Sequence, residues 1–532
     1  MRKLFLFILI HCTCIIAAHA DRKTAITDVQ NALLYTEYFY VDSVKSSKLA
    51  EDAIRGMLKA LDPHSTYLTQ EEVKHMNEGL GGNFEGIGVR YQMEKDTLLV
   101  ISTVVGGPSE KQGILAGDHI IAVNDTSIAG QKMTNKEIQR RLRGPKGSPV
   151  KITVLREGEN IDFVLTRDVI PVYSVDASYM ATPDVGYIRI ARFAQTTPAE
   201  VEEAMTKLSE QGMQNLIIDL QGNGGGYLES AVQLASMFLE KGQMVVYTTG
   251  RREPKRTHYA NRENNFKGRL VIMIDEESAS SSEIFTGAIQ DWDRGVIVGR
   301  RSFGKGLVQR PIELPSGAMI RLTIARYFTP SGRCIQKPFT KGEGDNYHKD
   351  LMTRYKKGEF ISADSIHLED SLMFITFGKR IVYGGGGIMP DVFVPMDTTK
   401  ITKTHRNLMA KGTMNRWILS YFKENQKKLH ASYENFEAFN QGFHITDADI
   451  ETLCHLGEKD SINIDKADIE KSDYLLKLQL KAYLANDLYE QGAYNRIMNQ
   501  RVPCFREAIS IISEEAKYYK YLMVAPSEVA KQ

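Results

Sequence analysis

Residues 270–292, LVIMIDEESASSSEIFTGAIQDW, decide the fold of this chain. The stretch opens with an unbroken apolar run, Leu270 to Ile274, which is typical of a β-strand. Serines and acidic residues follow, and apolar residues then recur at helical spacing through Phe285, Ile289 and Trp292. The pattern predicts a strand, a turn at the serines and a helix that begins near Ser280.

The same alternation continues on both sides of this stretch. It predicts an α/β layer with a largely parallel sheet. In sheets of this kind, active groups gather where strands end and helices begin. The further strand-like runs lie at 186–190, 216–220 and 296–298, and the helical patterns lie at 198–211, 228–240 and 280–292.

The chain has 532 residues, too many for one hydrophobic core, because single cores stop growing at about 250–300 residues. The spacing of its apolar residues changes along the sequence. Helical spacing comes first, followed by short strand-like runs between glycine turns, then by alternating strands and helices, and last by a charged helical tail. We predict a multidomain α/β protein. The expected parts are a signal peptide at 1–20, an N-terminal helical domain at 21–82, a small β-rich domain at 84–168, an α/β core at 169–396 and a C-terminal helical domain at 397–532.

The first twenty residues differ from the rest. Arg2 and Lys3 precede an apolar run from Leu4 to Ile10, and a small-x-small pattern ends at Ala20. This order is typical of a secretory signal peptide. We expect an exported, soluble mature chain. An uncleaved membrane anchor is the alternative, although the apolar run is shorter than the ~20 residues that a bilayer requires.

The composition argues against several classes of function. A formal net charge of +1 with 25% charged residues gives no sign of a polyanionic partner such as nucleic acid. The expected mature chain keeps only Cys334, Cys454 and Cys504, which excludes a disulfide framework and leaves a single bridge open. These cysteines lack the paired spacing of a zinc site, and no His-Glu-x-x-His motif occurs. We therefore expect neither a metallopeptidase nor a cofactor.

Ser280 has two interpretations. Ser280-x-x-Glu283 fits a capping box, and Ser278 is another candidate cap for the helix. The position also suits a nucleophile, because the first N–H groups of a helix are unsatisfied and its dipole stabilises developing negative charge. In that case the Ser280 hydroxyl attacks, and the N–H of Ser281 supplies half of an oxyanion hole.

A glycine-rich turn follows the strand at 216–220. Residues 219–226 read DLQGNGGG, with four glycines in the last five positions. Glycines let backbone N–H groups approach a ligand closely, so this turn is a candidate for the other half of the oxyanion hole. A plain connector is the alternative.

Lys305 lies in GRRSFGKG, residues 299–306, after another predicted strand. The spacing is close to that of a phosphate loop, but position 306 is Gly instead of the Ser or Thr that ligates magnesium, and the next residues do not open a helix. We therefore expect no nucleotide. A lysine between two glycines suits a general base if burial among apolar neighbours lowers its pKa. Ser280 with Lys305 is the predicted catalytic pair.

Together these segments resemble the C-terminal processing (tail-specific) serine peptidase family. The resemblance spans residues 28–395 and rests on SASSSE at 278–283, FGKG at 303–306, GNGGG at 222–226, Asp62-Pro63-His64-Ser65 and GGGGIMPDV at 384–392. It implies that Ser280 is the nucleophile, Lys305 the base and Gln309 a third residue that positions the lysine.

The resemblance also implies where the oxyanion is bound. The donors correspond to the Ser281 N–H and to Gly225 or Gly226. Usual family members carry Pro at 224 and Ala at 281, so the choice of glycine stays open. Structural support is expected from Glu283 and Asp291, which lie on the helix after Ser280.

Residues 84–168 resemble a PDZ domain, with Gly86-Ile87-Gly88-Val89 as its carboxylate-binding loop. A PDZ groove adds a peptide as a strand and captures its terminal carboxylate on backbone N–H groups. The resemblance therefore implies protein or peptide substrates with free apolar C-termini, met in the periplasm or cell envelope. A PDZ domain that only clamps or regulates the protein is the alternative, and association into a homo-oligomer stays open.

We therefore expect an exported serine endopeptidase, with a Ser-Lys peptidase core at 169–396, that recognises and cleaves proteins near their C-termini. The alternative from another class is a secreted PDZ scaffold whose protease-like domain is inactive.

Overall fold

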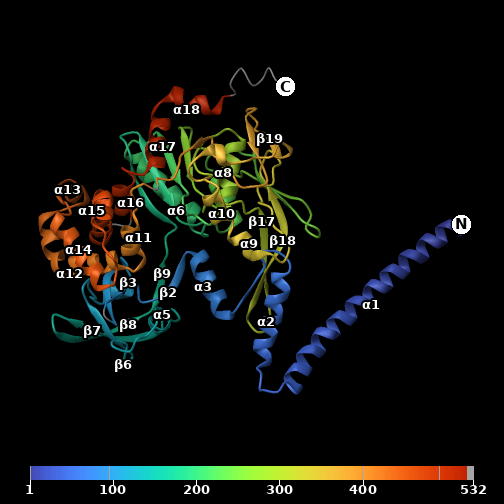
Figure 1. Cartoon of the computed structure of the whole chain (residues 1–532), viewed down its shortest axis with the longest axis horizontal. Coiled ribbons are helices and arrows are strands. Elements are labelled where there is room, and N and C mark those ends of the chain that lie inside the picture. The colour runs from blue at the N-terminus through green and yellow to red at the C-terminus, as the bar shows by residue number, and fades with distance from the viewer. Residues whose placement is uncertain (1, 95, 398, 490–491, 524–532) are drawn as a thin grey trace. The chain divides into compact units, whose positions relative to one another are not determined.

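The run Leu270–Ile274 forms strand β15 of a six-stranded sheet (Figure 1). The structure is a computed structural model and describes residues 2–94, 96–397, 399–489 and 492–523. The chain divides into two compact units. The first unit includes two segments from far along the chain, which the sequence did not reveal. It consists of residues up to 73, 309–324 and 339–350, and the second unit consists of 74–308, 325–338 and the residues from 351 onward.

The first unit combines helices with β1 and with parts of two later strands. Strand β1 (Thr66–Leu68) pairs antiparallel with the first residues of β18 (Met319–Phe328), with Thr66 opposite Arg321. The Asp62 carboxylate holds the turn before β1, because it accepts the N–H groups of His64 and Ser65 at 2.9 Å. The helices that precede β1 are α1 (Arg2–Phe39) and α2 (Ser46–Lys59).

The predicted signal peptide falls in the first half of α1, apart from Met1, which lies outside the described residues. Within the described part of the chain, no helix combines the length and apolarity that a membrane crossing requires. Signal cleavage and export stay predictions.

The segment that resembles a PDZ domain is a β-sheet with one longer helix. Its strands follow the order β3-β4-β5-β7-β8, with β6 paired to β5, and its core is formed by apolar residues such as Leu98, Val100, Ile120 and Ile152. β2 pairs with β9 beside this sheet. The elements are α3 (Gln70–Gly81), β2 (Asn83–Gly86), β3 (Val89–Glu94), β4 (Thr97–Thr103), α4 (Pro108–Lys111), β5 (His119–Val123), β6 (Thr126–Ser127), α5 (Asn135–Leu142), β7 (Pro149–Arg156), β8 (Glu159–Thr166) and β9 (Asp168–Pro171).

The α/β core contains the largely parallel sheet that the sequence predicts. Its strand order is β10-β11-β12-β15-β16-β21, and every neighbouring pair is parallel except β10 with β11. The strands beside β15 are β10 (Val175–Met180), β11 (Val185–Ile190), β12 (Asn215–Asp219), β16 (Val296–Gly299) and β21 (Val392–Phe393).

Helices cover both faces of this sheet, as its unbroken apolar strands require. Leu270, Ile272 and Ile274 pack on one face with α6 (Thr197–Glu210), α7 (Leu228–Ala235) and α8 (Ser281–Asp291). Val271 and Met273 pack on the other face with α17 (Pro503–Ser513) and α18 (Glu515–Leu522) (Figure 1). The multidomain α/β class predicted from the sequence is confirmed, but its last two helices belong to the core layer.

The remaining elements form a second sheet, short connectors and a helical bundle with its own apolar core. In the second sheet, β13 pairs with β14 and with residues 326–328 of β18. These elements are β13 (Met244–Thr249), β14 (Arg256–Tyr259), β17 (Leu307–Glu313), α9 (Gly344–His348), α10 (Asp350–Lys356), the 3-10 helices Ala363–Ser365 and Asp370–Leu372, β19 (Met373–Ile375) and β20 (Ile381–Tyr383). The bundle consists of α11 (Lys403–Ala410), α12 (Thr413–Ser432), α13 (Phe436–Gly442), α14 (Asp447–Lys459), α15 (Lys466–Leu488) and α16 (Ala493–Met498).

Candidate active site

Three loops meet at the carboxyl ends of strands β12, β15 and β16, where the strand order places them side by side. The N–H of Ala279 donates to the carbonyl of Asn223 at 3.0 Å, which joins the loops after β15 and β12. The N–H of Phe303 donates to the carbonyl of Ser278 at 3.0 Å, which joins the loops after β16 and β15. The three segments singled out in the sequence therefore form one site.

Ser280 occupies a strained backbone conformation directly before helix α8. Its φ of 57° and ψ of −113° lie in a region that non-glycine residues rarely adopt. Such strain persists only where the surroundings impose it, and it is concentrated at functional sites. A serine held on a strained turn between a strand and a helix is also how α/β-hydrolases expose their nucleophile. Ser280 itself is half-buried between two buried neighbours.

Asn223 fixes the glycine turn against the Ser280 turn. Its carbonyl also accepts the hydroxyl of Ser282 at 2.9 Å, so it holds residues on both sides of Ser280. Its buried side chain donates to the carbonyl of Ile190 at 2.7 Å and accepts the N–H of Gly225 at 2.8 Å. The turn is therefore rigidly placed against the start of α8.

Gly225 is the point of closest approach between the two turns. Its φ is +98°, and an added Cβ would lie 2.7 Å from both the Ala279 carbonyl oxygen and the Ser280 Cβ. No other residue fits here without moving the backbone that carries Ser280.

Gly226 presents its peptide groups toward the start of α8. A parallel bridge to Phe193 uses the carbonyl of Gly225 and the N–H of Tyr227, so the groups of Gly226 point to the opposite side. There the Gly226 carbonyl accepts the hydroxyl of Ser281 at 3.0 Å. The N–H of Gly225, by contrast, is directed to Asn223.

The Glu283 carboxylate joins the Ser280 turn to the Lys305 loop. Its Oε2 accepts the backbone N–H of Ser280 at 2.8 Å and that of Lys305 at 2.9 Å. Its Oε1 accepts the N–H of Gly304 at 2.7 Å and the hydroxyl of Ser302. The predicted capping contact from Glu283 to Ser280 is present, but the same carboxylate also fixes the loop that carries the lysine.

Tyr327 joins the same two residues from the other side. Its hydroxyl lies 3.1 Å from the carbonyl oxygen of Ser280 and also donates to the carbonyl of Lys305. The tyrosine is buried on β18. Glu283 binds the two N–H groups, and Tyr327 binds the two carbonyls, so the backbones of Ser280 and Lys305 are held in one fixed relation.

The loop around Lys305 is anchored on both sides of the lysine. The carbonyl of Gly304 accepts the N–H of Lys337 at 2.9 Å, and the N–H of Gly306 donates to Gln336 Oε1 at 2.8 Å. Strand β17 begins at Leu307, whereas a phosphate loop leads into a helix. Lys305 is half-buried between two buried glycines, which agrees with a lysine held at the edge of a site.

Glu283 is fully enclosed, and this changes its ionisation. Burial raises the pKa of Glu283 to about 7, although hydrogen bonds from Ser302, Lys305, Gly304 and Ser280 favour its charged form. The carboxylate accepts all four donors only when it is ionised, because a protonated oxygen is itself a donor. Protonation near pH 7 therefore weakens the link between Ser280 and Lys305.

Two other core residues were singled out in the sequence, Asp291 and Gln309. Asp291, at the far end of α8, accepts a hydrogen bond from Arg333 at 2.7 Å, and both side chains are completely buried. Such a contact suits structural support. Gln309 lies on β17 in the first unit, and its buried Nε2 has no hydrogen-bond partner among the described residues. The role of Gln309 beside Lys305 stays a prediction.

The predicted carboxylate-binding loop connects β2 to β3. The carbonyl of buried Ile87 accepts the N–H and hydroxyl of Ser109 at 3.1 Å and 2.7 Å, and Gly88 turns with a φ of +73°. Among the described strands, β3 pairs only with β4, so its other edge has no strand partner there, and Arg90 of β3 forms an ion pair of 2.8 Å with Asp487 of α15. The hydroxyl of Tyr91 on β3 contacts Asn135 of α5 at 2.5 Å, which ties this edge to the helix.

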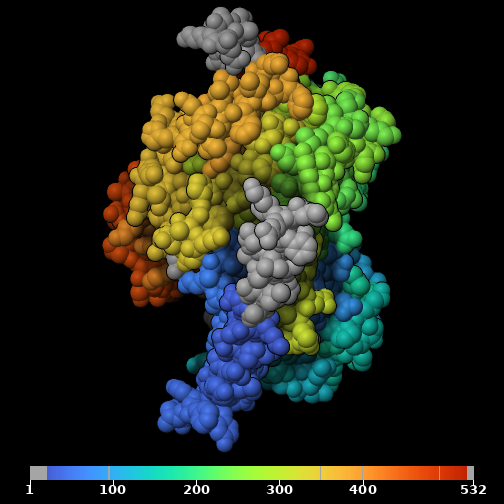
Figure 2. All heavy atoms as spheres, turned by 90° about the vertical axis from the view of Figure 1, so that its right-hand side faces the viewer, coloured from blue at the N-terminus to red at the C-terminus, as the bar shows by residue number. Residues whose placement is uncertain are grey.

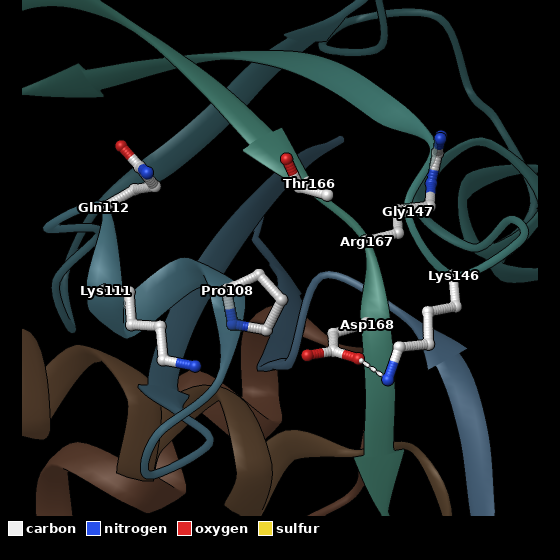
Figure 3. A pocket seen from close by; sticks show the side chains of 8 residues that line it. All are labelled: Pro108, Lys111, Gln112, Lys146, Gly147, Thr166, Arg167 and Asp168. Atoms are coloured by element: carbon white, nitrogen blue, oxygen red, sulfur yellow. Dashed lines mark ion pairs between the residues drawn. The ribbon is translucent and has the colours of Figure 1, made fainter.

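A cavity of about 260 Å³ lies on the same domain, beside α4 and the end of β8 (Figure 3). Lys146 and Asp168 form an ion pair of 3.0 Å at its wall. Pro108, which also lines the cavity, packs behind Gly88 of the carboxylate-binding loop.

Sequence reasoning missed Tyr327, Asn223 and Ser302 as parts of the site. Asn223 and Ser302 stand inside the quoted motifs, so their spacing to the glycines and to Lys305 was an available signal. Tyr327 lies in a different sheet, and no sequence pattern connects it to Ser280.

Comparisons with known proteins give the class of this molecule. Residues 184–342 match the family model of peptidase family S41, and residues 86–167 match that of the PDZ domain. Residues 404–490 match a family of unknown function, DUF8443. The carboxy-terminal processing protease CtpA of Bacillus subtilis is 34% identical over 330 residues, which cover 60% of this chain and 70% of that protein. CtpB of the same bacterium is 29% identical over 482 residues, covering 88% and 91%.

A solved structure of a photosystem II D1 C-terminal processing protease is also similar. The match covers 58% of this chain and 89% of the protease chain, with 29% sequence identity and a TM-score of 0.33. A PDZ domain followed by an S41 core defines a serine-type peptidase. The chain belongs to the carboxy-terminal processing proteases.

Replacing Gly225 tests the close approach of the two turns. Gly225→Ala is expected to lower peptidase activity by about 10²-fold or more, as loss of an oxyanion donor does, because its Cβ displaces the Ser280 turn. Gly224→Ala is the matched control, since nothing lies within 4 Å of a Cβ there. Steady-state cleavage of an unfolded protein measures both, and equal activity of the two variants would contradict the packing described.

The ionisation of Glu283 makes stability depend on pH. Its pKa in the folded protein lies above the ordinary 4.5, so the folded state holds more protons than the unfolded state between pH 4.5 and about 7. This carboxyl therefore makes the free energy of unfolding fall as pH rises through that window. Glu283→Gln removes this dependence, and the exposed Glu210→Gln keeps it.

The measurement is chemical unfolding at several pH values, followed by fluorescence of Trp292 at the end of α8 in a Trp417→Phe background. The same pH slope with the Glu283 carboxyl present and in the Glu283→Gln variant would show that this carboxyl has an ordinary pKa.

Proposed function

We propose that the protein is an exported endopeptidase that uses Ser280 as nucleophile and Lys305 as general base to cleave proteins near their C-termini. The observation that carries this proposal is the shared oxygen of Glu283, which accepts the N–H groups of both residues. A network that fixes two half-buried, chemically reactive residues to one another is expected of a catalytic pair. The strained φ of Ser280 adds independent support.

The proposed reaction has two stages. The neutral Lys305 amine removes the Ser280 proton, the hydroxyl oxygen attacks the scissile carbonyl, and a tetrahedral intermediate forms. The Lys305 ammonium then protonates the leaving amine, which departs as the new N-terminus and leaves an acyl-enzyme on Ser280. Water, deprotonated by Lys305, hydrolyses this ester and restores the serine. The proton taken from Ser280 leaves on the amine, a proton from water replaces it on the serine, and Lys305 ends neutral, so the reaction needs no metal or organic cofactor.

We assign the oxyanion to the N–H groups of Ser281 and Gly226. Ser281 is the first residue of α8, where N–H groups lack an intrahelical acceptor. The Gly226 peptide faces the same turn, whereas the N–H of buried Gly225 already donates to Asn223. This favours Gly226 over Gly225 as the second donor, and it gives Gly225 the role of close packing. Gln309 keeps its proposed role of orienting Lys305.

The substrates are proposed to be proteins with free apolar C-termini. The edge of β3 that has no partner among the described strands and the loop from Gly86 to Val89 suit strand addition and carboxylate capture. The names of the relatives describe processing of carboxyl termini, which agrees with this mode of recognition. Export to the periplasm or cell envelope is proposed on the signal-like residues 1–20. An inactive scaffold receives no support from the similarity to named proteases.

Three variants test the catalytic pair. Ser280→Ala and Lys305→Ala are each expected to reduce kcat/KM by at least about 10³-fold, since members of a catalytic unit lose most of the rate singly. Ser281→Ala is the control, because it removes a neighbouring hydroxyl but keeps the backbone N–H, and it should stay within about tenfold of wild type. Cleavage of an unfolded protein with an apolar C-terminus is followed by mass spectrometry.

Undiminished cleavage by Ser280→Ala or Lys305→Ala would contradict the pair. A wild-type protein that binds the C-terminal peptide and never cleaves it would instead favour the inactive scaffold.

A further inference from the structure

The connection between β13 and β14 carries an isolated group of positive charge. Residues 250–256 read GRREPKR, and Arg251, Arg252, Lys255 and Arg256 are all exposed. The whole chain has a net charge of only +1. In Figure 2, the bright-green part of the chain, which includes this hairpin, lies at the surface of the face shown.

One carboxylate, Glu253, stands among these four cations in the sequence. Within the described part of the chain, no ion pair joins a carboxylate to Arg251, Arg252, Lys255 or Arg256, whereas the exposed Lys207 and Lys267 pair with Glu203 and Glu240. Lys255 lies over the ring of Tyr247 at 4.1 Å, which orders the hairpin without cancelling its charge. Residues 250–256 therefore carry a net charge of +3, and a positive potential from charges so close together attracts acidic groups.

The strand register places this charge beside the catalytic pair. Thr248 of β13 lies opposite Tyr327 of β18 on one side and opposite Arg256 of β14 on the other. Residues directly opposite one another in a sheet point to the same face, and two strand spacings amount to about 10 Å. Arg256 therefore projects from the face on which the Tyr327 hydroxyl contacts Ser280 and Lys305.

Arg251 and Arg252 extend the positive surface beyond the sheet. Arg251 follows Thr248 by three residues, or up to about 10 Å of extended chain. An extended peptide cleaved at Ser280 covers the same distance in about three residues. The long side chains of Arg251 and Arg252 therefore come within reach of peptide side chains that lie three to five positions from the scissile bond.

We propose that Arg251, Arg252 and Arg256 form a specificity site that binds acidic side chains of the polypeptide substrate a few residues from the scissile bond. This inference rests on the proposed function and names the class of substrate, namely proteins with an acidic segment near an apolar C-terminus. The PDZ domain then selects the free end, and the basic hairpin selects the sequence that enters the active site. Because the arginines are exposed, their effect is screened by salt.

The test compares peptides that share an apolar C-terminus and differ in three residues, Asp-Glu-Asp or Asn-Gln-Asn. One pair carries them three to five positions before the scissile bond, and another carries them after it. The acidic member of at least one pair should show about tenfold higher kcat/KM at low salt, since three exposed ion pairs of ordinary strength multiply to that factor. The preference should fade as salt rises.

Two variants and a remote control assign the preference to the hairpin. Arg251→Glu/Arg252→Glu/Arg256→Glu should lose or reverse the preference and keep cleavage of the neutral peptides, which also shows that it folds. Replacing the same three residues by Lys should preserve the preference. Lys466→Glu/Lys471→Glu, on exposed positions of α15, changes the net charge away from the core and should have no effect.

Two results would overturn this inference and leave the proposed function standing. One is an unchanged ratio of kcat/KM between acidic and neutral peptides in the triple Arg→Glu variant. The other is equal cleavage of acidic and neutral peptides by the wild-type protein. Absence of cleavage of every peptide would overturn the proposed function and this inference with it.

Discussion

The Glu283 carboxylate is the interaction on which the site depends. Its four hydrogen-bond donors come from the turn after β15 and the loop after β16. Parallel pairing places these two segments at the same edge of the sheet, but it does not fix them to one another. A buried acidic group is costly unless its lone pairs are satisfied, and here they are satisfied by the segments that must be held together. The desolvation that raises the pKa of Glu283 thus comes from the same enclosure that fixes Ser280 relative to Lys305.

The rest of the core supplies the conditions for this contact. Close packing of Gly225 against the Ser280 turn leaves no space for relaxation, so the strained φ of Ser280 is maintained by its neighbours. Tyr327 connects the pair to the second sheet, and through Thr248 that sheet leads to the basic hairpin. The proposed catalysis and the proposed choice of substrate therefore depend on one continuous set of hydrogen bonds and strand pairings.

Much of this could be predicted from the sequence, because the signals were local. The apolar run 270–274 and the glycines at 222–226 identified a strand end and a ligand-facing turn, and the parallel topology explains why they meet. Tyr327 could not be predicted, since its contact with Ser280 depends on how a strand from another sheet packs against the core. The sequence predicts helix α17 as part of the C-terminal domain, whereas it packs on the core sheet, because an amphipathic pattern does not reveal which surface a helix covers.

Labelling of the nucleophile tests the central claim most directly. A fluorophosphonate reacts with activated serine hydroxyls, and peptide mass spectrometry identifies the residue that carries it. The account predicts labelling at Ser280, slowed by about 10²-fold in Glu283→Gln, because a Gln side chain presents an N–H₂ group to two of the four donors. Labelling of another serine, or an equal rate at Ser280 with and without the Glu283 carboxylate, would contradict it.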